Sequence, residues 1–387
     1  MNHVPITALQ YLCLIDINAA IRRKLILYVK ISIYIYRIMS QWIVDRLFDT
    51  QEKQKPLFAF QGTVNWMRAL SILVDGKDFE DDAIKAHYSN VKRRPNVNVD
   101  ADNLVFENML MAFHNHASLI SLNKDISHPY NTCRTAIVCW YYSIYFTCSA
   151  MIGAATGSKQ ETHTETARVW QFDIVDKNLV LSPFSLSLSS LVESTVEAEI
   201  SAYRKDNKYS LNDGSPQNED EAWGAVVSYL KGTCEYEKYR VEEKVKNSSE
   251  FKKLGVQNFR KKVARDLRDS QLRKKGVNFL TQAFRYRGKA NYRDSVFLSY
   301  GYDQSEQIKM FCQDLEKVSF VFQRMASFYL SKRVEKGTWT QFVDDLEKNS
   351  RLSIDTNFFR VLAPLCSRSS RSINRNLYTQ SMLLTFV

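Results

Sequence analysis

The chain has 387 residues, of which 45% are hydrophobic and 12% aromatic, and its formal net charge is +11. This composition excludes a disordered protein, and only 12 Gly and 7 Pro argue against a turn-rich β-sandwich or barrel. The positive charge favours a polyanionic partner. Seven cysteines without a C-x-x-C pair, and histidines not spaced with them, predict reduced thiols, a cytoplasmic location, no metal and no cofactor.

Residues 1–38 have an unusual bias toward Ile and Tyr, strongest in the run Leu25–Ile38. Lys30 and Arg37 interrupt that run, and charges near the middle of a bilayer are costly, so we expect no membrane span. Three interpretations stay open: a dispensable leader with translation beginning at Met39, a peripheral helix, or a membrane anchor. We favour the first.

Residues 39–125 form a smaller N-terminal helical segment in this interpretation. Val64–Leu73 and Leu104–Leu122 have the helical spacing of apolar residues. His114 and His116 are two apart, so on a helix they point to different sides and do not form a paired ligand set. We therefore expect them to be ordinary surface or core histidines.

The stretch Arg134–Ile152 is the most apolar part of the chain. It contains neither Gly nor Pro, and its apolar residues occur on every face of a helical wheel. A helix of this kind is normally buried by neighbours on all sides. We expect an all-α helical bundle spanning 126–345 around this helix, with Gly153 or Gly157 as its C-terminal stop.

The region after the central helix changes character. Val169–Leu181 mixes apolar residues with short polar gaps, which predicts a small irregular or β-hairpin insertion with Asp176–Asn178 as the turn. Ser185–Ile200 then has a helical pattern, and Lys205–Glu221 is a polar loop.

Residues 252–275 contain ten basic residues and only two acids, Asp266 and Asp269, and therefore carry a net charge of +8. Their spacing predicts one helix with an apolar stripe that includes Val263 and a wide cationic face. Phosphates are the natural counter-charge, whereas the alternative is a solvated face of a core helix. The candidate nucleic-acid-binding residues in this segment are Lys261, Lys262, Arg265, Arg268, Lys274 and Lys275.

The stretch Phe284–Asp294 interleaves basic residues with tyrosines. Arginine binds phosphate well and tyrosine stacks on bases, so this stretch is a second candidate for nucleic-acid contact. Alternatively, it begins a helix whose Tyr292 enters the core while the arginines pair with acids such as Asp294. The candidate contacts here are Arg285, Lys289 and Arg293.

Three features together resemble a known family. The central helix contains a Tyr-Tyr-x-x-Tyr pattern, the sequence Arg-Gly-Lys-Ala-Asn-Tyr follows far downstream at Arg287–Tyr292, and a long helix at Gln307–Lys332 comes last. This arrangement is similar to the HEPN superfamily of helical bundles. The resemblance covers Arg134–Lys336, with Gly157–Gly276 as a large insertion. It implies a bundle able to form a homodimer and a link to nucleic acids, including RNases of defence or toxin systems.

This sequence lacks the catalytic motif of those RNases at its usual spacing. They carry an Arg followed by four to six residues and then His, whereas the corresponding positions after Arg287 hold Tyr292, Arg293 and Asp294. His163 can approach Arg287 only through folding. The resemblance therefore predicts the fold better than the activity.

We expect an RNA-binding or other polyanion-binding protein without standard HEPN catalysis. One alternative is a divergent RNase that uses Arg287, with Tyr292 or His163 in supporting roles. The other is a protein-interaction module whose basic surface faces an acidic partner. Residues 346–387 lose periodicity and are expected to form a loosely held basic tail, with a frameshifted or otherwise non-native end as the alternative.

Overall fold

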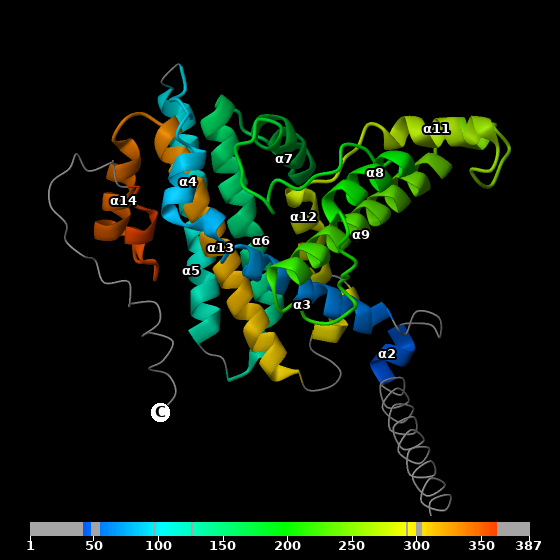
Figure 1. The fold of residues 1–387 in the computed structure, drawn as a ribbon, viewed down its shortest axis with the longest axis horizontal. Coiled ribbons are helices and arrows are strands. Elements are labelled where there is room, and N and C mark those ends of the chain that lie inside the picture. The colour runs from blue at the N-terminus through cyan, green and yellow to red at the C-terminus, as the bar shows by residue number, and fades with distance from the viewer. Residues whose placement is uncertain are drawn as a thin grey trace, which may run out of the picture.

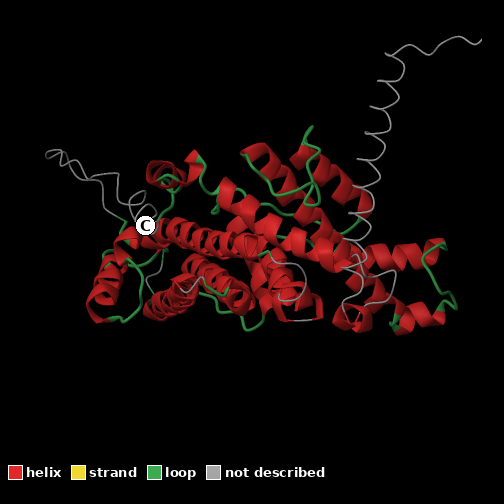
Figure 2. Cartoon of the chain, turned by 90° about the horizontal axis from the view of Figure 1, so that it is seen from below, coloured by secondary structure: helices red, strands yellow, loops and turns green. Residues whose placement is uncertain are grey.

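The computed structural model describes residues 42–47, 55–95, 98–124, 127–291, 293–298 and 304–361. The expected leader, 1–38, and most of the expected basic tail lie outside these residues. The described part is helical throughout and contains no strand (Figure 2), which confirms the all-α prediction. Its one β-like feature is an isolated antiparallel bridge between Leu188 and Val277.

Thirteen α-helices make up the described part (Figure 1). Their bounds are α2 Trp42–Leu47, α3 Lys55–Leu73, α4 Asp81–His87, α5 Val99–Lys124, α6 Pro129–Thr156, α7 His163–Trp170, α8 Glu193–Arg204, α9 Glu219–Lys246, α10 Ser249–Lys253, α11 Lys262–Leu272, α12 Phe279–Asn291, α13 Ser305–Arg333 and α14 Thr338–Asn349. Short helical turns lie at η1 Lys77–Phe79, η3 Arg293–Leu298 and η4 Thr356–Phe359, and a π-helix, η2, at Gln171–Val175.

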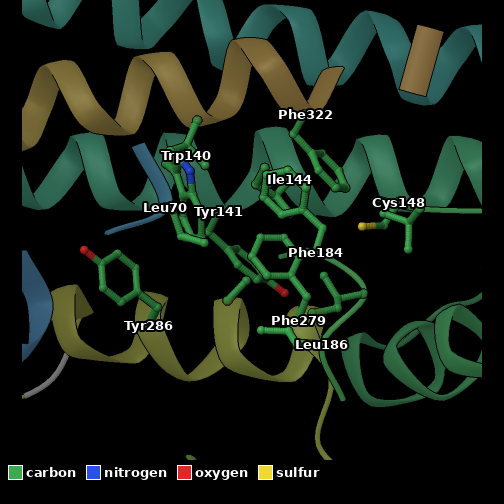
Figure 3. Close-up of a cluster of buried hydrophobic side chains, with 14 of the residues drawn as sticks. Leu70, Trp140, Tyr141, Ile144, Cys148, Phe184, Leu186, Phe279, Tyr286 and Phe322 are labelled. Carbon is green, nitrogen blue, oxygen red and sulfur yellow. The ribbon is translucent and has the colours of Figure 1, made fainter. Parts of the chain in front are cut away.

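Helix α6 is the predicted central helix. It packs against α5, α13 and α12, and Trp140, Ile144 and Met151 are fully buried. Figure 3 shows α6 side chains meeting Phe184 and residues of α12 and α13. Among the described helices, α6 alone is long and apolar enough to cross a membrane, and 67% of its most apolar window is buried inside the protein. A core helix of a bundle gives the same pattern.

The C-terminal end of α6 is closed by two arginines. Gly157 takes the left-handed conformation, with φ of 74°, that commonly ends a helix. Arg94 Nη1 donates to the Gly153 carbonyl at 3.0 Å, and Arg333 donates to the next two carbonyls at 3.1 and 2.8 Å. Arg94 also forms a buried ion pair with Asp102 at 2.6 Å. The Gly153 carbonyl also accepts from the Gly157 N–H at 2.7 Å, so carbonyls at the negative end of the helix receive positively charged donors in addition to the backbone cap.

One hydrophobic core joins the helices before residue 126 to those after it. Trp66 of α3 meets Trp140 of α6 edge to face, with ring centroids 5.8 Å apart, and Phe113 of α5 lies in the same buried cluster. Helix α13 has an apolar stripe of residues three or four apart that is buried, and the helix packs on α6. Its members are Phe311, Leu315, Val318, Phe322, Met325 and Tyr329.

The region at 169–192 is irregular, and the hairpin alternative does not form. Helix α7 continues directly into the π-helix, because Trp170 and Ile174 are buried one helical turn apart while Phe172 is 56% exposed. The helix expected at Ser185–Ile200 begins only at Glu193. Before it, Leu186 and Leu188 are both buried two residues apart, the period of an extended chain.

The expectation of one continuous helix over 252–275 is also wrong. Helix α10 ends at Lys253 and α11 begins at Lys262, and Gly255 takes a positive φ of 60° between them. This break resets the helical phase, so residues on its two sides do not form one stripe. Val263, expected in that stripe, is 62% exposed.

Candidate functional site

The first candidate surface is the basic arm, which we define as residues 252–275. Helix α11 and the adjoining end of α9 extend to the side of the molecule away from α5 and α14 (Figure 1). Nine of the ten basic residues of the arm are exposed, and none of the nine forms an ion pair with a described carboxylate. They are Lys252, Lys253, Arg260, Lys261, Lys262, Arg265, Arg273, Lys274 and Lys275.

The tenth basic residue, Arg268, has a different environment. Its side chain is 19% exposed, it pairs with Glu242 of α9 at 3.5 Å and with Asp269 at 2.9 Å, and its guanidinium lies 5.4 Å from the centre of the Phe259 ring. Arg268 therefore joins α11 to α9, and its charge is already compensated. The other predicted contacts of the arm remain accessible.

Two predicted contacts on α12, Arg285 and Lys289, face α9 and α3. Arg285 Nη1 donates to Thr233 Oγ1 at 3.0 Å, and its guanidinium lies 4.9 Å from the centre of the Tyr236 ring. Lys289 Nζ donates to a threonine hydroxyl of α3 at 3.2 Å and lies 5.2 Å from the Tyr229 ring centre. Both cations are half-buried and are held by hydroxyls and aromatic faces.

Arg287 lies on another face of α12 and reaches the tyrosines of α6. Its Nη1 donates to Tyr142 Oη at 3.0 Å, and its guanidinium carbon lies 5.0 Å from the ring centres of Tyr141 and Phe284. Its Nε is buried without a hydrogen-bond partner, and no described carboxylate lies within ion-pair distance. The half-buried guanidinium thus retains hydrogen-bonding capacity and an uncompensated charge.

Folding brings His163 to the same tyrosines. His163 is the first residue of α7, a helix whose N-cap, Thr162, accepts from a backbone N–H. Its Nδ1 lies 2.7 Å from Tyr141 Oη, and its ring centre lies 4.5 Å from that of Tyr145 and 5.3 Å from that of Phe284. Burial, and then the charge of Arg287, lower the pKa of His163 below its ordinary value. The imidazole is therefore neutral at neutral pH.

We call this cluster the Arg287 site; it consists of Arg287, His163, Tyr141, Tyr142 and Tyr145. Burial is the largest influence on the Tyr141 phenol and raises its pKa, although the charge of Arg287 opposes this effect. Tyr141 is therefore protonated at neutral pH. The arrangement places a guanidinium close to a neutral imidazole, which can accept a proton, and to phenolic hydrogen-bonding groups.

Two of the predicted site residues, Tyr292 and Arg293, cannot be placed in the site. Tyr292 lies outside the described residues, and the side chain of Arg293 is also outside them. The sequence carried one signal for the Arg287 site: the tyrosines of the Tyr-Tyr-x-x-Tyr pattern gather along one part of an otherwise apolar helix, although nothing in it indicated that His163 would reach them. Within the described ranges, no cluster of three or more His, Cys, Asp or Glu residues is suited to hold a metal ion.

Comparisons with protein-family models, curated proteins and solved structures found no match to this chain. The similarity to the HEPN superfamily therefore remains a proposal based on its motifs.

Proposed function

We propose that this chain is an RNA-binding protein whose main contact surface is the basic arm. The observation that carries the proposal is the set of nine exposed cations without a carboxylate partner among the described residues. Surface charges of an ordinary solvated helix are commonly balanced by nearby acids, as Arg268 is here. A polyanionic backbone balances the remaining cations and gains free energy by releasing condensed counterions.

The motif resemblance supports a finer version of this proposal. In that version the protein is a HEPN-like bundle of a defence or toxin system and acts in the cytoplasm as a homodimer, without a membrane partner. Its RNA contacts require no standard HEPN catalytic motif.

Salt-dependent binding tests the proposal. We expect a labelled single-stranded RNA to bind in fluorescence anisotropy, with an affinity that falls steeply as KCl rises. Each phosphate contact contributes roughly 0.7 to the log–log salt slope on single strands, so replacing Lys261, Lys262 and Arg265 by Gln is expected to lower the slope by about 2. Absence of binding at low salt, or an unchanged slope, would contradict the proposal.

A matched control removes the same charge elsewhere. Lys332 at the end of α13, Lys336 in the loop that follows and Lys348 on α14 are exposed, and these elements lie away from the arm (Figure 1). Replacing these three residues by Gln is expected to leave the slope unchanged. An equal fall in slope in the control would mean that binding follows net charge and does not use the arm.

A second function, RNA cleavage at the Arg287 site, is favoured by the guanidinium without a carboxylate partner next to a neutral imidazole. In this reaction Arg287 binds the non-bridging phosphate oxygens. His163 Nε2 takes the proton of the ribose 2′-hydroxyl, the 2′-oxygen bonds to phosphorus, and the bond from phosphorus to the 5′-oxygen breaks. The leaving oxygen takes a proton from water, which gives a 2′,3′-cyclic phosphate and a 5′-hydroxyl. The base role requires the tautomer whose Nδ1–H donates to Tyr141 Oη.

Product analysis tests this second function. We expect wild-type protein to leave 2′,3′-cyclic phosphate ends on a labelled RNA, and Arg287→Ala and His163→Ala to abolish them. Arg285→Ala is the matched control, because it removes an arginine of the same helix whose guanidinium contacts α9. Equal cleavage by wild type and Arg287→Ala would assign the activity to a contaminant or to another site.

A further inference from the structure

A pocket opens between the C-terminal part of α9, α10 and α11. Its volume is about 740 Å³, within the range typical of small-molecule sites, about 300–1,000 Å³. Its apolar wall is made by two valines and one leucine, and three lysines stand around it. These residues are Val241, Val245, Leu267, Lys244, Lys274 and Lys275.

The polar groups of the pocket are available to a ligand. The three lysines are exposed and form no ion pair with a described carboxylate. Gln271 is half-buried, and its side-chain amide has no hydrogen-bond partner in the described part of the chain. Asn247 Nδ2 donates to the Glu243 carbonyl, which leaves the amide oxygen of Asn247 as an acceptor. Glu250 is the one acidic residue of the lining and can accept from a ribose hydroxyl or a base amino group.

This combination fits a nucleotide better than an acyl chain. An acyl chain needs a long apolar channel, whereas only three of the lining residues are apolar. A nucleotide needs one apolar surface for its base, amide groups at the base edge and cations at its phosphate. Val245 and Leu267 supply the first, Gln271 the second, and Lys274 and Lys275 the third.

We propose that the pocket binds one unstacked nucleotide and thereby makes the basic arm select single-stranded RNA over duplex. The inference rests on the proposed RNA binding by the arm and adds its substrate class. A paired base in a duplex is stacked and has its edge occupied, so it cannot enter the pocket without breaking the pair. A single strand offers its bases freely, while the exposed cations of the arm bind the phosphates of either form.

Filling the pocket without changing the charge tests this selectivity. Gln271→Trp places a large ring in the pocket, and Gln341→Trp is the matched control, since Gln341 is exposed on α14, outside both the arm and the pocket. The measurement is the Kd for a short single strand and for the same sequence as a duplex. Wild type and Gln341→Trp are expected to prefer the single strand by about tenfold or more, equivalent to about 1.4 kcal/mol. Gln271→Trp is expected to bind both forms equally, with an unchanged salt slope.

Failure of the inference differs from failure of the proposed function. A wild-type protein that binds single strand and duplex equally, or a Gln271→Trp variant that keeps the preference, overturns the pocket assignment. Absence of salt-dependent binding to either RNA overturns RNA binding itself. Competition on wild-type protein keeps the test valid if Gln271→Trp does not fold. Excess nucleoside 5′-monophosphate is expected to weaken single-strand binding more than inorganic phosphate at equal ionic strength, and equal effects of the two would refute the assignment.

Discussion

His116 gives the protein a defined sensitivity to acid. The side chain is 3% exposed on α5, and its Nδ1 lies 3.0 Å from Ser319 Oγ of α13. Ser319 Oγ lies 2.6 Å from Ser143 Oγ of α6, which accepts from Gln323 Nε2 at 2.7 Å. This network joins three helices of the core. A charge on His116 would therefore be buried among hydroxyl and amide groups, and no described acid forms an ion pair with it. Burial lowers the pKa of His116 from 6.5 to about 4.

The sign and size of the effect follow from this shift. The folded pKa lies below the unfolded one, so folding favours the neutral imidazole. The stability it contributes is complete above pH 6.5 and is lost as pH falls from 6.5 toward 4. Because one pKa unit corresponds to about 1.4 kcal/mol, the full loss is on the order of 3 kcal/mol, and roughly 2 kcal/mol is lost by pH 5.

Urea unfolding of wild type and His116→Gln between pH 7.5 and pH 5 measures this loss. Glutamine keeps hydrogen-bonding groups but does not titrate, and the carboxylates common to both proteins cancel in the difference. We expect the wild type to lose roughly 2 kcal/mol more than the variant over this range, whatever their difference at pH 7.5. Parallel pH profiles for the two proteins would refute the argument.

Three further substitutions test the arm, the end of α6 and a glycine of α3. Arg268→Ala is expected to cost about 1 kcal/mol of unfolding free energy through loss of the Glu242 pair and the contact with Phe259. It is also expected to weaken the single-strand preference with only a small change in salt slope; a lost salt slope would instead make Arg268 a main phosphate contact. Gly157→Ala is expected to lower stability by about 1 kcal/mol, because the residue has positive φ and the new Cβ lies 3.2 Å from a neighbouring side chain. Gly62→Ala is expected to raise stability by roughly 0.5–1 kcal/mol, because Gly62 is helical and the new Cβ meets no atom within 4 Å beyond its chain neighbours and its own helix backbone. Thermal or urea unfolding that ranks Gly157→Ala as the more stable of the two glycine variants would contradict this.

The central part of the fold could be predicted from the sequence because its determinants are local. A helix with apolar residues on every face must be buried, and α6 is. The stripe of α13 repeats every three or four residues and is buried as a unit. The sequence pattern is less informative where it fits both the helical and the extended period. Leu186 and Leu188 fit a helical segment, yet they are buried along an extended chain in which Leu188 pairs with Val277.

The candidate sites were less predictable because they depend on partners distant in sequence. Composition indicates that residues 252–275 are basic but does not indicate that Arg268, unlike Lys261, meets an acid of α9. The contact of His163 with Tyr141 likewise depends on how α7 packs over α6, and no spacing rule encodes it. The pocket also depends on the break at Gly255, which separates α10 from α11.

Helix α12 shows why counting cations cannot assign a function. Arg285 and Arg287 are two residues apart, so the helix directs them to different faces. Arg285 donates to a threonine hydroxyl and lies over the Tyr236 ring. These contacts stabilise its charge without an anionic ligand. Arg287 also contacts aromatic rings, but its Nε is buried without a hydrogen-bond partner, which is true of no nitrogen of Arg285. Folding therefore leaves an uncompensated desolvation free energy at Arg287 that it does not leave at Arg285. An anion bound at Arg287 would offset that free energy. The exposed cations of the arm bear no such cost because water solvates them, so they suit a mobile polyanion, whereas Arg287 suits one phosphate in a fixed position.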